Sequence, residues 1–204
     1  MSPSFETAVA STSLHVEVAR TAVTQSDEEL LSRARAGDAE AFRVIFDRES
    51  PGVRRFLGDL LRDDGAADEG TQETFVRAHQ KLGTLSHTEK LQGWLIGIAR
   101  MVFMESLRRK RRDRPQLAAD LEPVQIDRAP SPEAALLGAE ADRVLEGALE
   151  QLSADRRAAL LMRLDHGLGY GDIAEAMGWP LQKVKNEIHR ARLQLRERLA
   201  EYLT

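Results

Sequence analysis

The sequence predicts an all-α protein of two small helical domains joined by a Pro-rich flexible linker. Three observations predict this fold class. Helix-favouring Ala, Leu, Arg and Glu dominate the composition, and aromatic residues make up only 5% of it. Apolar residues recur at helical spacing in both halves of the chain. Between the halves, four of the seven prolines fall from Pro115 to Pro132, where proline removes backbone donors and favours extended conformations.

The prolines set the expected domain boundaries. We expect a mobile N-terminal extension over 1–25, a first domain over 26–114, a linker over 115–139 and a second domain over 140–204. The extension has neither a basic start nor a continuous apolar stretch, unlike a secretory signal. No apolar stretch approaches the roughly 20 residues of a membrane span. We therefore expect a cytoplasmic protein with no membrane insertion of its own.

The first domain should begin with two helices. One spans about 27–36, and Gly37 ends it. Asp38 caps the second, which carries a stripe of Phe, Ile, Val and Leu. Pro51-Gly52 predicts a break within this second helix, because proline disrupts the interior of a helix.

The third helix should run over about 68–82. One side of it carries an acidic strip formed by Glu69, Gln72 and Glu73, with Val76 beside them. Gly70 weakens the helix by about 1 kcal/mol relative to Ala.

The fourth helix, about 91–112, follows a loop over 83–90 and is apolar almost all round from Trp94 to Met104, so it should be central to the domain. It ends in five consecutive cations over 108–112, which suit contact with a phosphate backbone; a merely solvated end is the alternative. One stripe along this helix differs from the apolar pattern, because it carries glycine and arginine residues. Its members are Gly93, Gly97, Arg100, Met104, Arg108 and Arg111.

The sequence of the second domain predicts a helix-turn-helix followed by a long basic helix. Ser153 caps a helix over about 154–166, a short helix covers 170–177, and Gly178-Trp179-Pro180 makes a tight turn before a basic helix over 181–199. This geometry seats a helix in the DNA major groove. With Val184 facing inward, the opposite face carries the predicted DNA-reading residues: Gln182, Lys183, Lys185, Asn186, His189 and Arg190.

Charge is unevenly distributed although the net charge is only −4. Residues 100–114 hold seven basic and two acidic side chains, and 181–199 hold six basic and two acidic. Residues 59–73 and 115–155 are instead strongly acidic. The alternation indicates two DNA-facing surfaces, together with acidic surfaces for a basic partner or for each other. Solvated helix faces without a partner are the alternative for any single block.

Catalysis and metal binding have no support in the sequence. There is no cysteine, and the five histidines are scattered without metal-ligand spacing. No nucleophile elbow or phosphate-cradling Gly loop is present. We therefore expect no metal, no cofactor and no enzymatic activity.

Several segments resemble bacterial sigma factors of the sigma-70 family, specifically the extracytoplasmic-function (ECF) group. GDAEAF at 37–42, QETFVRA at 72–78 and WLIGIAR at 94–100 resemble successive signatures of sigma domain two. DIAEAMG at 172–178 and VKNEIHRAR at 184–192 resemble sigma domain four. The segments occur in the family's order, and together they are far more specific than a helix-turn-helix alone.

The resemblance implies a function in transcription initiation. Domain two would dock on the β′ clamp helices of core RNA polymerase and open the −10 promoter element, and domain four would sit on the β flap and bind the −35 element. An anti-sigma factor is the expected regulator. The acidic strip Glu69, Gln72 and Glu73 would be the core-binding site, and the loop over 83–90 would capture a flipped base. The implied −10 contacts are Trp94, Arg100, Arg108, Arg109, Arg111 and Arg112.

Some residues depart from the family's pattern. Lys183, Asn186 and Glu187 stand where Thr, Ser and Arg are usual, so the family's base preference cannot be carried over. Glu187 would either repel phosphate or accept a hydrogen bond from cytosine. Met101 replaces a usual Asn, and Trp94 could be either a wedge in the opened duplex or a core residue.

A stand-alone helix-turn-helix transcriptional regulator is the alternative function. It would need an effector domain or a dimer interface, and the N-terminal half shows neither a βα pattern nor heptads.

Overall fold

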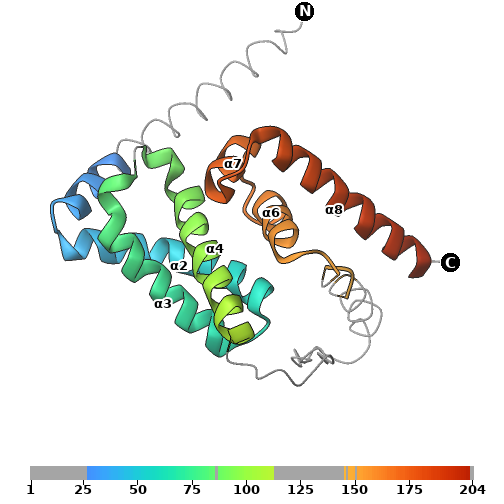
Figure 1. The fold of residues 1–204 in the computed structure, drawn as a ribbon. Coiled ribbons are helices and arrows are strands. Elements are labelled where there is room, and N and C mark those ends of the chain that lie inside the picture. The colour runs from blue at the N-terminus through green and yellow to red at the C-terminus, as the bar shows by residue number, and fades with distance from the viewer. Residues whose placement is uncertain (1–26, 86, 113–144, 146, 150, 203–204) are drawn as a thin grey trace, which may run out of the picture.

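The computed structural model describes residues 27–85, 87–112, 145, 147–149 and 151–202, and all regular structure in these ranges is helical (Figure 1). The expected N-terminal extension and linker lie outside these ranges. Residues 27–35 form the first helix. The other elements follow in the order α2 (Ala39–Leu61), α3 (Asp64–Lys81), η1 (Leu82–Thr84), η2 (Thr88–Lys90), α4 (Leu91–Arg112), α6 (Ala154–Leu164), α7 (Tyr170–Met177) and α8 (Leu181–Tyr202).

Helix α2 runs without interruption through Pro51, so the expected break at Pro51-Gly52 is wrong. A proline inside a helix costs about 3 kcal/mol. Three side chains that follow it on one face, Val53, Phe56 and Leu57, are almost completely buried, and each contributes about 1.5–3 kcal/mol. Their burial outweighs the cost. At the N-terminus, the Asp38 carboxylate accepts hydrogen bonds from the backbone amides of Glu40 and Ala41.

Helix α3 begins at Asp64, about one turn earlier than expected, because Asp63 caps it by accepting from the amide of Ala66. Gly70 has a packing role in this helix. A Cβ added to it would lie 3.1 Å from Cδ1 of Leu57 on α2. The glycine therefore allows α3 to approach α2 closely, which offsets its poor helix propensity.

Helix α4 lies at the centre of the molecule, as expected from its apolar sequence. It contacts α2 and α3 on one side and α7 on the other. Leu95, Ile96, Ala99 and Phe103 are at most 1% exposed. The whole 22-residue helix is nevertheless too interrupted by charge to cross a bilayer, and no helix within the described ranges is both long and apolar enough to do so.

The second domain has the expected helix-turn-helix order. Ser153 accepts from the amide of Arg156 at the start of α6, which ends at Leu164, slightly before the expected 166. Gly178 adopts a left-handed conformation (φ 63°) and closes α7. Val184, Ile188 and Ala191 of α8 are at most 1% exposed and form the inner face of the helix.

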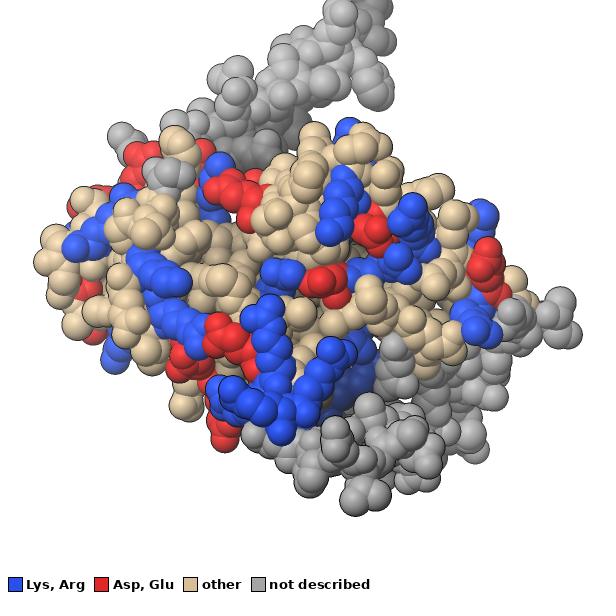
Figure 2. All heavy atoms as spheres, viewed as in Figure 1, with Lys and Arg blue, Asp and Glu red and all other residues tan. Residues whose placement is uncertain are grey.

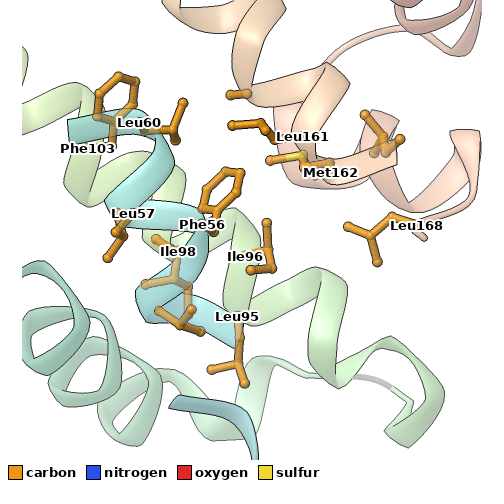
Figure 3. Close-up of a cluster of buried hydrophobic side chains, with 14 of the residues drawn as sticks. Phe56, Leu57, Leu60, Leu95, Ile96, Ile98, Phe103, Leu161, Met162 and Leu168 are labelled. Atoms are coloured by element: carbon orange, nitrogen blue, oxygen red, sulfur yellow. The ribbon is translucent and has the colours of Figure 1, made fainter. Parts of the chain in front are cut away.

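The two domains share one continuous apolar core. Figure 3 shows Phe56 and Leu60 of α2 and Ile96 of α4 facing Leu161 and Met162 of α6. Helix α6 contacts α2, and α7 contacts α4 (Figure 1). The packing between domains was not expected from the sequence beyond the complementary charge blocks.

Candidate nucleic-acid interface

The N-terminal half of α8 presents the six predicted DNA-reading side chains to solvent. All six are exposed, whereas Val184 and Ile188 between them are buried. The amides of Lys183 and Val184 both bond to the carbonyl of Pro180, so the helix starts directly at the turn. The side-chain amide of Gln182 donates to Asn186 (3.1 Å). Amide side chains of this kind bond bidentately to adenine in the major groove.

Lys183 differs from its neighbours because an aromatic ring holds its ammonium group. Its Nζ lies 4.0 Å from the centroid of the Trp179 ring, within the turn that precedes α8. Such a cation–π contact contributes about 0.5–1 kcal/mol at an exposed site. The ammonium group is thus positioned beside the turn before any DNA arrives.

Glu187 does not project toward a DNA surface in this structure. Its side chain is only 16% exposed, and its carboxylate accepts from Arg156 of α6 (2.8 Å) and from Arg190 (3.1 Å). Arg156, followed by Arg190, lowers the pKa of Glu187, so the carboxylate is ionised at neutral pH. Each of its two oxygens thus already has an arginine partner within the domain.

The C-terminal end of α4 forms a second cationic surface. Its members are all exposed: Arg108, Arg109, Lys110, Arg111 and Arg112. Figure 2 shows Lys and Arg gathered at the lower end of α4. A neighbouring carboxylate, Glu105, moderates this charge, but its bidentate bonds go to Arg77 of α3 (2.7 and 2.8 Å). The five cations themselves are exposed among the residues that the structure describes.

The upper part of the expected α4 stripe is covered by the second domain. Gly93 and Gly97 are buried, and a Cβ added to Gly97 would lie 3.3 Å from the Cα atom of Ala176 on α7. Arg100, a predicted −10 contact, donates to Asp155 of α6 (2.5 Å), and its side chain is only 15% exposed. The predicted −10 residues are thus divided between a covered group and an exposed one.

Trp94 lies half-buried at the edge of a cavity of about 220 Å³ between the domains. The wall of this cavity includes Thr84, Leu85 and Lys90 from the loop that the resemblance associates with a flipped base. Lys90 donates to Glu175 of α7 (2.8 Å) across the cavity mouth. Trp94 therefore packs partly against the core and also lines this cavity.

The acidic strip on α3 is exposed as expected. Glu69, Gln72 and Glu73 all face solvent, and Val76 next to them is 54% exposed. Glu73 accepts from Arg77 (2.7 Å), and Arg77 in turn holds Glu105. The side chains of Glu105 and Glu73 raise the pKa of Arg77, which keeps it cationic.

Sequence reasoning missed the residues that join the domains. Besides Asp155 and Glu175, these include Arg157, which donates to the carbonyl of Leu60 (3.0 Å), and Arg55, which donates to the carbonyl of Asp165 (3.3 Å). His166 is buried at 7% exposure, with its ring edge-on to Phe56 at 5.5 Å. Only the complementary signs of the charge blocks could have suggested these contacts.

No cluster of three or more potential metal ligands occurs among the residues that the structure describes. The interface thus consists of exposed cationic and amide side chains on two helical domains. This arrangement defines a class: a two-domain helical protein with a helix-turn-helix for DNA.

Comparison with known proteins identifies the family. Residues 45–113 match the model of Sigma-70 region 2, and residues 142–195 match that of Sigma-70, region 4. The RNA polymerase sigma-H factor of Pseudomonas aeruginosa is 30% identical over 175 residues, which cover 82% of this chain and 91% of that protein. The ECF RNA polymerase sigma factor SigC of Mycobacterium tuberculosis is 31% identical over 179 residues, with 83% and 91% coverage. The chain belongs to the ECF group of RNA polymerase sigma factors.

Solved structures agree with this assignment. The sigma factor RpoE of Bartonella quintana, crystallised in complex with the anti-sigma factor NepR, matches 79% of this chain and 98% of its own, with a TM-score of 0.65 and 27% identity. CnrH, in complex with the cytosolic domain of CnrY, shares the fold at 22% identity and a TM-score of 0.61.

Proposed function

We propose that this sigma factor binds promoter DNA at two points, with the exposed face of α8 on the −35 element and the cationic end of α4 near the −10 element. The observation that carries the proposal is the exposure of all six reading residues of α8 above a fully buried inner face. A helix fixed in this way presents the same side chains to each promoter. Gln182, Lys185 and Asn186 lie in its first two turns, where base contacts are made.

The −10 surface combines two kinds of contact. Arg108, Arg109, Arg111 and Arg112 supply phosphate contacts from the exposed end of α4. Trp94 and Arg100 lie nearer the N-terminus of the same helix, Trp94 at the cavity between the domains and Arg100 in its ion pair with Asp155, and they contact DNA once Asp155 releases Arg100. Stacking of an unpaired base on an indole contributes about 1–3 kcal/mol, comparable to the cost of unstacking.

The acidic strip on α3 is the surface for core polymerase. Glu69 and Gln72 are exposed, and Glu73 lies beside them with its ion-pair partner Arg77. The exposed apolar side chain of Val76 adds an apolar contact. A carboxylate strip around an apolar side chain suits a basic partner surface such as the β′ clamp helices, whereas domain four would sit on the β flap.

Regulation by an anti-sigma factor is part of the proposal, because the solved relative RpoE was crystallised with one. We propose residues 26–114 and 140–204 as the two functional domains. The protein would act in the cytoplasm, where core polymerase is, and would contribute binding and strand separation rather than bond chemistry of its own. A stand-alone regulator is disfavoured, because the exposed acidic strip would then lack a partner.

In-vitro transcription with core polymerase freed of its own sigma factor tests the function. Added protein should co-elute with core and start transcripts at defined positions in a pool of genomic fragments. A chain that does neither is not a working sigma factor.

Two sets of substitutions separate the surfaces. Charge reversal of Glu69 and Glu73 should weaken binding to core at least 5-fold, since each reversal adds repulsion at the docking surface. Lys185→Ala should leave core binding unchanged, lower promoter affinity and reduce its salt dependence by about one ion. If both sets affect core binding equally, the division between the two surfaces is wrong.

A further inference from the structure

Glu187 lies within the sequence stretch that carries the DNA-reading residues, but its side chain is turned toward the protein. Asn186 and His189 near it are exposed, whereas the Glu187 side chain is 16% exposed. The burial of Val184 and Ile188 on the inner face fixes the rotation of α8 about its axis. The position of Glu187 between the two faces therefore follows from the packing of the helix rather than from its own charge.

Arg156 of α6 connects Glu187 to a second point on α8. Its Nε and Nη2 atoms each lie 2.8 Å from Oε2 of Glu187, and its Nη1 donates to the side-chain oxygen of Gln194 (2.7 Å). Glu187 and Gln194 are seven residues apart, or about two turns of one helical face. A planar guanidinium with these two hydrogen bonds and one further ion-pair contact fixes α8 to α6 along that length.

The other oxygen of Glu187 holds Arg190. The Nη1 atom of Arg190 lies 3.1 Å from Oε1, while the Arg190 side chain is 63% exposed. Arg190 thus faces solvent with its guanidinium group drawn back toward the N-terminus of α8. A free arginine side chain would sample many rotamers, and a fixed one loses less conformational entropy when it binds.

We propose that Glu187 is a positioning residue of the recognition helix, which, while held by Arg156, fixes the direction of Arg190 and thereby selects the base that Arg190 reads. The inference rests on the proposed reading of DNA by α8. It gives Glu187 a part in specificity without a DNA contact of its own.

The test uses holoenzyme assembled from core polymerase and the full chain, transcribing a library of promoters with a randomised −35 element. Sequencing the transcripts gives the preference at each base. In Glu187→Gln, which keeps the shape and removes the charge, discrimination should fall about 5-fold or more at one position or two adjacent ones and stay unchanged elsewhere. Glu197→Gln is the matched control, because Glu197 is exposed on the same helix. It should keep the wild-type profile.

Arg156→Lys provides a second route to the same result. An ammonium group cannot reproduce the planar guanidinium's simultaneous contacts with Glu187 and Gln194, so this variant should shift preference at the same positions as Glu187→Gln. It also decides the matter if Glu187→Gln does not fold.

Two results would overturn the inference. One is an unchanged profile in folded Glu187→Gln, and the other is a uniform rise in transcription from all sequences, which would mean that Glu187 only repels phosphate. Failure of the proposed function is distinguishable, because wild-type holoenzyme would then show no preference in the −35 element at all.

Discussion

Gly97 is a position where the two domains approach closely, and replacing it with leucine should separate them. A Cβ at residue 97 would lie 3.3 Å from Cα and 3.4 Å from Cβ of Ala176, and 3.6 Å from the Ala176 carbonyl oxygen. Two of these atoms belong to the backbone of α7 and cannot move aside as a flexible side chain would. Leucine adds three further carbons in that direction.

The size of the shift toward separation follows from overpacking at the contact, and helix propensity acts only on the stability of domain two. Overpacking a tight contact costs about 1–3 kcal/mol. Within domain two, the same change favours α4, because leucine is a better helix former than glycine by close to 1 kcal/mol. The equilibrium between packed and separated domains should therefore shift about 5- to 150-fold toward separation, while domain two itself stays folded.

Fluorescence energy transfer measures this separation directly. The chain has no cysteine, so Gln80→Cys on α3 and Glu197→Cys on α8 provide two unique labelling sites, both at exposed positions. Transfer efficiency should fall in Gly97→Leu. Gly58→Leu is the control, because a Cβ at this glycine in α2 meets nothing within 4 Å. It receives the same change in helix propensity without the clash.

Separation should also change DNA binding. Arg100 loses Asp155 when the domains part, so Gly97→Leu should bind a single-stranded −10 oligonucleotide more tightly than the wild type. If transfer efficiency and oligonucleotide affinity are the same in Gly97→Leu and Gly58→Leu, the contact between α4 and α7 does not hold the domains together.

Two further predictions concern stability. Burial, followed by the charge of Arg55, lowers the pKa of His166 below its ordinary 6.5, so the stability associated with the neutral imidazole is complete above pH 6.5 and is lost as the pH falls below it. The melting temperature should therefore drop between pH 7 and 5, and it should drop less in His166→Leu. An equal drop in both proteins would mean that His166 does not determine this pH dependence. Leu57→Ala on α2 should lower the free energy of unfolding, measured with denaturant, by about 2–5 kcal/mol, because Leu57 is fully buried. Val44→Ala on the same helix, where Val44 is 44% exposed, should change this free energy by less than about 0.5 kcal/mol. Similar losses in the two variants would refute the assignment of the core.

Periodicity and capping made most of each domain predictable. The helical stripes identified the buried faces of α2, α4 and α8, and the Ser153 cap and the Gly178-Trp179-Pro180 turn located the helix-turn-helix. The error at Pro51 arose because a local rule was applied where tertiary burial contributes more free energy than the proline costs. At Gly70, too, a tertiary contact matters more than local helix propensity. The glycine allows close packing against Leu57, and no local sequence pattern reveals that contact.

The candidate site was less predictable, because its residues depend on contacts between segments far apart in sequence. Exposure on α8 and on the end of α4 followed from helical spacing alone. The pairing of Arg100 with Asp155 and of Glu187 with Arg156 did not, because nothing in the sequence specifies which carboxylate a given arginine meets.

Because of these two ion pairs, the two proposed DNA-binding surfaces differ in how far they are exposed. On α8 the reading residues are exposed, and the Glu187–Arg156 pair supports them from within the domain. On α4 the Asp155 carboxylate of the other domain is paired with Arg100, which we proposed as a −10 contact. In the proposed function, Arg100 would contact DNA only after the domains part, whereas α8 would need no such change. On the proposed function, separation of the domains would therefore limit access to the covered part of the −10 surface, and Gly97 is the position at which a single side chain would alter that limit.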